Sequence, residues 1–102
     1  MCNNMEVIVF ISKELLNFIT VANVKSLGKA SELLFVTRSP ICRSLKKLEH
    51  TLGVKLFIRK GQGLILTEDG IILYNKVFTL YCQLDELQNL YRRERLSLIE
   101  YN

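Results

Sequence analysis

Apolar residues recur at steps of three and four along three stretches between residues 12 and 52, which is the spacing of amphipathic helices. Each stretch follows a hydroxyl residue that can cap a first turn, namely Ser12, Ser26 or Thr37. Pro40 fits the first turn of the third helix, and Gly53 is the residue type that ends a helix. Three helices are therefore predicted between residues 12 and 52. Their inward-facing positions are Leu15, Phe18, Ile19 and Ala22, then Ala30, Leu33 and Leu34, then Ile41, Leu45, Leu48 and Leu52.

Two short β-type runs follow the third helix, at residues 55–58 and 64–66. The loop between them, residues 59–63, holds two glycines, which can supply the positive φ angles of a hairpin turn. Thr67 can then cap a last helix, whose first turn contains acidic residues that suit the helix dipole. The pattern predicts a two-stranded hairpin that leads directly into a long helix.

The last helix carries the most regular periodicity in the chain. Six apolar residues are spaced alternately four and three apart, as at the a and d positions of a coiled coil, and a second apolar stripe runs beside them. Apolar residues make up 49% of only 102 residues, more than so small a core can bury. Both facts favour a dimer, and the alternative that both stripes pack within one chain stays open. The predicted dimer contacts are Leu73, Val77, Leu80, Leu84, Leu87 and Tyr91, and the second stripe is Tyr74, Phe78 and Tyr81.

Positive charge is concentrated in the middle of the chain. Overall there are 14 Lys and Arg against 10 Asp and Glu, but residues 25–60 contain nine basic residues and only two acidic ones. Such a segment is typical of a protein that binds a polyanion, although a solvated basic face without a partner gives the same count.

The order of helix, short helix, helix and basic hairpin describes a winged helix-turn-helix. The predicted fold class is mainly α, with three helices and a two-stranded wing followed by a long C-terminal dimerisation helix. We expect an N-terminal extension over 1–11, a DNA-binding domain over 12–67, a linker or dimerisation helix over 68–96 and a tail over 97–102.

The outward side of the third helix is polar and basic, while its inward side is aliphatic. A major groove admits one helix, so this side is predicted to face double-stranded DNA. Arginine near the start can bond base edges, while lysines further along suit phosphates. The predicted DNA-contacting residues are Ser26, Lys29, Thr37, Arg38, Ser39, Pro40, Cys42, Arg43, Lys46 and Lys47 of the helices and Arg59, Lys60 and Gln62 of the wing.

Several motifs together resemble the DNA-binding domain of LysR-type transcriptional regulators, over roughly residues 14–95. The resemblance implies base reading by the third helix, backbone contacts by the wing, and dimerisation by the linker helix. Its implied base-reading positions are Arg38, Ser39, Pro40, Cys42 and Arg43. The motifs are Leu15-x-x-Phe18, Ser26-Leu27-Gly28-Lys29-Ala30-Ser31, Val36-Thr37-Arg38-Ser39-Pro40-Ile41-Cys42-Arg43, Leu48-Glu49-x-x-Leu52-Gly53-x-x-Leu56-Phe57-x-Arg59 and Leu66-Thr67-x-x-Gly70.

The chain departs from that family at several places. Arg38 stands where the family usually has glutamine, Cys42 where it usually has serine, and Ser31 replaces the second alanine of a usual pair. The operator preference of relatives is therefore not transferred. Family members also continue into an effector-binding domain, so for this chain we expect no small-molecule effector.

No catalytic, cofactor or metal site is predicted. His50 is the single histidine, and the three cysteines lack CxxC spacing, which excludes the usual zinc patterns and gives no support for a disulfide framework. No nucleophile and base can be placed together, so an enzyme is not expected. With neither a signal peptide nor a membrane-spanning run, the chain is expected in the cytoplasm, associated with the nucleoid. Glu49 is a candidate partner for Arg59 that would orient the wing.

The sequence thus predicts a homodimeric, sequence-specific transcriptional regulator on a pseudo-palindromic site. The alternative is an interaction protein that pairs its linker helix with that of a larger LysR-type regulator and modulates it.

Overall fold

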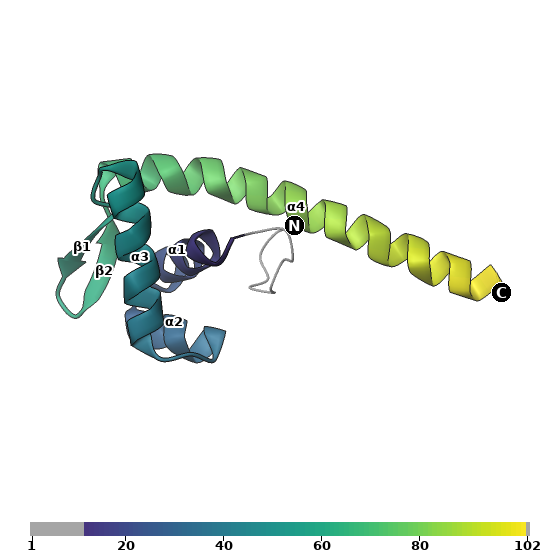
Figure 1. Cartoon of the computed structure of the whole chain (residues 1–102), viewed down its shortest axis with the longest axis horizontal. Helices are drawn as coiled ribbons and strands as arrows, with labels where there is room; N and C mark the ends of the chain where they lie inside the picture. Colours follow the sequence, from purple (N-terminus) through teal and green to yellow (C-terminus); the bar gives the residue numbers. More distant parts are fainter. Residues whose placement is uncertain (1–11, 102) are drawn as a thin grey trace.

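The first three helices and the hairpin, residues 13–66, form a small head, from which a long C-terminal helix projects (Figure 1). The computed structural model describes residues 12–101, with side chains over 12–91, so the predicted extension at 1–11 lies outside the described residues. The molecule measures 55 × 25 × 21 Å, and its long axis follows the last helix. The elements are α1 (Lys13–Val24), α2 (Leu27–Leu34), α3 (Arg38–Leu52), β1 (Phe57–Lys60), β2 (Gly63–Leu66) and α4 (Glu68–Tyr101). The predicted fold class is confirmed.

Local capping chemistry sets most helix ends where the sequence predicts them. The hydroxyl of Ser12 accepts a hydrogen bond from the Leu15 N–H at 3.2 Å, and Ser26 caps α2 in the same way. Gly53 ends α3 with a φ of 73°. Thr37 does precede α3, but its side chain makes no capping bond. α4 is longer than expected, because residues 97–101 continue the helix instead of forming a separate tail.

The core lies where α1 crosses the other elements. Phe18 and Val21 of α1 are fully buried, and the Phe18 ring lies 5.5 Å from that of Phe57, which brings the start of the hairpin onto the helices. Ala30 is also fully buried, as expected for a small residue that lets α2 approach closely. The remaining buried apolar side chains are Ile19, Ile41, Leu45, Leu56, Val77 and Tyr81.

The wing is an antiparallel pair in which Phe57 faces Leu66 and Lys60 faces Gly63. Its first strand starts two residues later than the sequence predicts. Leu56 lies opposite Thr67 in the same register and accepts the Thr67 N–H at 2.9 Å, but its own N–H donates to Oε2 of Glu49 at 2.7 Å and returns no ladder bond. The Thr67 hydroxyl also donates to the Lys55 carbonyl at 2.6 Å. The first strand therefore enters the ladder only at Phe57.

The two wing glycines serve different purposes. Gly61 has the expected positive φ, 62°, at the turn. Gly63 does not, but a Cβ there would lie 2.8 Å from the Lys25 carbonyl oxygen, which also accepts the Leu64 N–H at 3.0 Å. Gly63 thus allows the wing to lie against the end of α1.

The first turns of α4 are fixed to the head. Val77 and Tyr81 are buried in the core, and the Tyr74 hydroxyl donates to Asn23 of α1. Burial also raises the pKa of the Tyr74 hydroxyl. The predicted coiled-coil seam is consequently divided. Val77 is covered by its own head and Leu73 and Leu84 are half-buried, whereas Leu80, Leu87 and Tyr91 are exposed by 54%, 41% and 59%.

Replacing Gly70 is expected to destabilise the fold. A Cβ at this buried glycine would lie 2.3 Å from the Leu56 carbonyl oxygen, a backbone atom that cannot yield easily. Gly70→Ala should lower the free energy of unfolding by about 1–3 kcal/mol, measured by urea denaturation. Gly28→Ala is the matched control, since its Cβ would meet only the end of the flexible Arg38 side chain. Equal stability of the two variants would contradict the proposed packing of α4.

Candidate nucleic-acid interface

α3 presents one polar face to solvent along its whole length. Ile41, Ser44 and Leu45 turn inward and are buried. The opposite side carries five of the predicted DNA-contacting residues in exposed positions, while Pro40 and Cys42 are half-buried at its edge. α1 and α2 pack against the inner side of α3 (Figure 1), where Ile41 and Leu45 join the core. The exposed residues are Arg38, Ser39, Arg43, Lys46 and Lys47.

A small cleft joins α2, the start of α3 and the wing. It has a volume of about 110 Å³ and brings together four residues that the sequence predicts as DNA contacts, from three different elements. Among the residues with described side chains, no acidic residue lines it. Its lining residues are Ser26, Leu27, Gly28, Arg38, Arg59, Gln62 and Leu64.

The other predicted contacts lie outside this cleft. Lys29 of α2 and Lys60 at the end of β1 are both exposed. Thr37 is exposed directly before α3, at the turn that follows Phe35. Phe35 itself is 93% exposed with a φ of 56°, an unusual position for an aromatic residue that the sequence did not indicate.

Gly28 is the site residue that sequence reasoning missed. A Cβ at this position would lie 2.7 Å from Nη2 of Arg38, so the guanidinium lies directly over the glycine. The available signal was a glycine inside a helix, where this residue type is unfavourable and usually has a packing reason.

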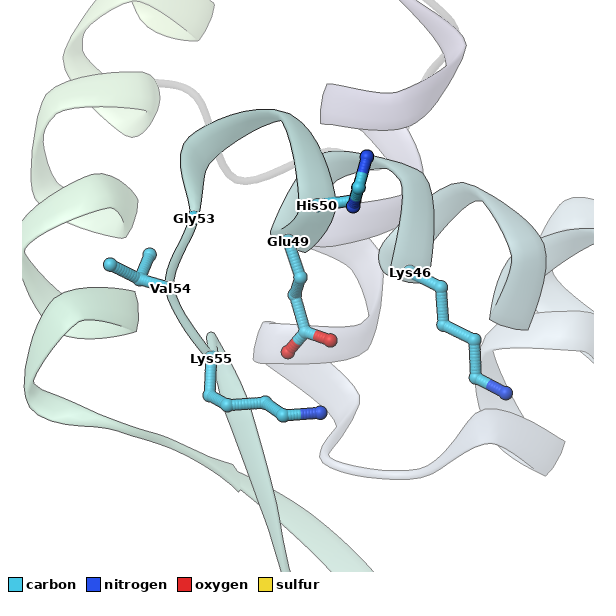
Figure 2. Close-up of a pocket in the computed structure, with 6 residues that line it drawn as sticks. All are labelled: Lys46, Glu49, His50, Gly53, Val54 and Lys55. Atoms are coloured by element: carbon cyan, nitrogen blue, oxygen red, sulfur yellow. The ribbon is translucent and has the colours of Figure 1, made fainter.

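Glu49 fixes the wing to α3, but through different atoms from those predicted. Its Oε2 accepts the Leu56 N–H at 2.7 Å and lies 3.5 Å from the Phe57 nitrogen, instead of pairing with Arg59. In Figure 2 its carboxylate points toward the segment that enters β1, with the Lys55 side chain alongside. The surrounding open pocket, of about 380 Å³, lies at the C-terminal end of α3 and is also lined by Lys46, His50, Gly53 and Val54.

In the part of the chain that the structure describes, no three His, Cys, Asp or Glu side chains lie close enough together to bind a metal ion. Cys42 is a free thiol. Cys82, by contrast, is disulfide-bonded, which the spacing of the cysteines did not indicate. Among residues 12–101, no helix combines the length and apolarity that crossing a bilayer requires.

Residues 12–71 match the protein family described as "Bacterial regulatory helix-turn-helix protein, lysR family". The chain is 37% identical over 95 residues to the Escherichia coli K12 protein named "Uncharacterized HTH-type transcriptional regulator YgfI", covering 89% of this chain and 32% of that protein. It is 40% identical over 78 residues to the virulence genes transcriptional activator of Salmonella typhimurium, covering 76% and 26% of the two chains. The chain thus spans about a third or less of these relatives.

Two similar solved structures contain DNA. The BenM DNA-binding domain with benA site 1 DNA has a TM-score of 0.74 at 25% identity, over 81% of this chain and 93% of that one. The CbnR DNA-binding domain complex with DNA has a TM-score of 0.67 at 29% identity, over 84% and 95%. These relatives are regulators, in agreement with the expectation that the chain is not an enzyme.

Removal of the Glu49 carboxylate is expected to loosen the wing. Glu49→Ala leaves the Leu56 N–H without its acceptor, which should cost about 1–3 kcal/mol of unfolding free energy. Hydrogen exchange at the Leu56 amide should accelerate in step with this loss. Glu32→Ala, at an exposed position of α2, is the control and should change stability by less than about 0.5 kcal/mol. An unchanged exchange rate at Leu56 in Glu49→Ala would argue against this tether.

Proposed function

Because the chain belongs to the LysR family of bacterial helix-turn-helix regulators, we propose that it binds specific sites in duplex DNA as a homodimer and thereby regulates transcription. The observation that carries the proposal is the exposed polar and basic face of α3, flanked by a basic wing. A helix of this kind fits the major groove, and its first turns then lie nearest the base edges. The DNA complexes of the BenM and CbnR domains support this reading for a similar fold.

Base contacts and phosphate contacts fall on different parts of this face. Arg43 is exposed in the second turn of α3 and is the candidate for a bidentate contact to a guanine. Lys46 and Lys47 follow one turn later, where a helix that crosses the groove meets the backbone. Arg59 and Lys60 of the wing are also exposed and add further positive charge. Binding should therefore weaken steeply as salt concentration rises.

The dimer interface is proposed on the exposed apolar side of α4. Leu80 and Leu87 lie two turns apart on that side, and Tyr91 continues the stripe. A groove of about 340 Å³ runs along it, between Leu15 at the start of α1 and Leu84. A partner helix placed there would cover apolar surface that one head leaves open, with the buried Val77 forming the floor.

A two-fold dimer would present two α3 helices to the DNA and so match a pseudo-palindromic site. The same face would equally accept the linker helix of a larger LysR-type regulator. In that second case the chain would act by forming a mixed dimer, and it would co-purify with the larger protein instead of with itself.

Arg43 is expected to determine sequence specificity. Arg43→Ala should weaken binding to a selected high-affinity duplex by about 1–3 kcal/mol and relax the preference at one base pair, as measured by fluorescence anisotropy. Lys76→Ala removes the same charge from an exposed site on α4 and serves as the control. Unchanged specificity in Arg43→Ala would contradict the assignment of α3 as the reading helix.

Charge placed on the α4 stripe is expected to separate the dimer. Leu87→Glu should shift the mass measured by sedimentation equilibrium from dimer toward monomer, because it would bury a carboxylate in an apolar contact. Ile71→Glu is the matched control, since Ile71 is 50% exposed and lies on the other side of the helix. A wild-type monomer in solution would favour the mixed-dimer alternative.

A further inference from the structure

The Arg38 side chain does not extend straight outward from the exposed polar face of α3. Three atoms of its guanidinium group lie within 3.5 Å of the point where a side chain at Gly28 would begin, with Nη2 the nearest at 2.7 Å. The group is therefore folded back from α3 over the backbone of α2. Any residue larger than glycine at position 28 would displace it.

The folded-back guanidinium shares its cleft with a second one. Arg38 from α3 and Arg59 from β1 line the same cavity, and the Gln62 side chain at the wing turn completes its polar lining. No carboxylate lines this cleft, so within the described residues nothing there balances the two charges. Two like charges that converge on one cleft favour an anion as the missing ligand.

The size of the cleft also restricts its ligand. Its volume of about 110 Å³ is well below the ~300–1,000 Å³ of pockets that hold organic molecules. Paired guanidinium groups are suited to the oxygens of a phosphate, which they bind through parallel N–H donors. The cleft is lined by residues of α3 and of the wing, the two elements that the proposed function places against DNA.

We propose that Gly28 and Arg38 act as a pair: the missing side chain at residue 28 holds the Arg38 guanidinium in the cleft, where Arg38 and Arg59 together clamp one phosphate of the DNA backbone. Arg38 then adds affinity for any duplex and does not select a base, in contrast to the sequence-based expectation. This inference rests on the proposed function, in which α3 and the wing face DNA. Base selection remains with residues further along α3, above all Arg43.

The test compares two duplexes of equal length, one selected from a random pool by the wild-type chain and one with its sequence scrambled. Arg38→Ala should weaken binding to both by about the same factor, tenfold or so, and lower the slope of log affinity against log salt by about 0.9. Gly28→Ala keeps the charge but moves it, so it should weaken both complexes several-fold. The double variant should bind no more weakly than Arg38→Ala alone, because both changes remove the same contact.

Two further measurements test whether these losses of affinity come from effects on folding or from a general loss of charge. Alanine is a better helix former than glycine, so Gly28→Ala should melt no lower than the wild type. Lys76→Ala removes one charge far from the cleft and should leave the salt slope nearly unchanged.

Two results would overturn the inference while leaving the proposed function intact. One is a loss in Arg38→Ala confined to the selected duplex with an altered base preference, which would make Arg38 a base reader. The other is no loss on either duplex. Failure of the wild-type chain to bind either duplex would instead remove the proposed function and the phosphate clamp together.

Discussion

The peptide groups around Leu56 hold the three functional parts of this molecule in one arrangement. The Leu56 N–H donates to the Glu49 carboxylate of α3, and its carbonyl accepts the Thr67 N–H at the start of α4. The Leu56 side chain is almost fully buried in the core. Gly70 then lets the first turn of α4 come directly against the same carbonyl. The reading helix, the wing and the long helix therefore share a single junction.

This junction gives the candidate interface its shape. Because the wing is tied to α3 at its base and to the end of α1 through the Lys25 carbonyl, Arg59 is carried to the same cleft as Arg38. Neither residue could be placed there by its own element alone. These backbone contacts bring basic residues that are distant in the sequence to one place on the surface.

Local chemistry explains why much of the fold could be predicted from the sequence. Ser12, Ser26 and Gly53 act within one helical turn of their positions, so their roles follow from neighbouring residues. The outward residues of α3 follow equally from helical periodicity. The order of the elements and the exposed polar face of α3 were therefore predicted correctly.

Long-range contacts account for what the sequence did not reveal. The first strand starts late because Glu49 of α3, seven residues away, accepts the Leu56 N–H that would otherwise continue the ladder. Periodicity placed Val77 and Leu80 in one seam, but it cannot say which of them the head covers. Likewise, Gly28 and Arg38 lie on different helices, and their contact depends on how α2 and α3 pack. In each case the deciding atom belongs to another element.

The connection between the wing and α4 consists of Thr67 alone, and this residue is itself hydrogen-bonded on both sides. A connection this short and this well bonded restricts rotation of the head relative to α4. In a dimer built on α4, the two heads would keep a fixed separation and orientation before they meet DNA, so binding would cost little conformational entropy. The same rigidity would make the complex intolerant of altered spacing, since five extra base pairs would turn one half-site by about half a helical turn away from its reading helix.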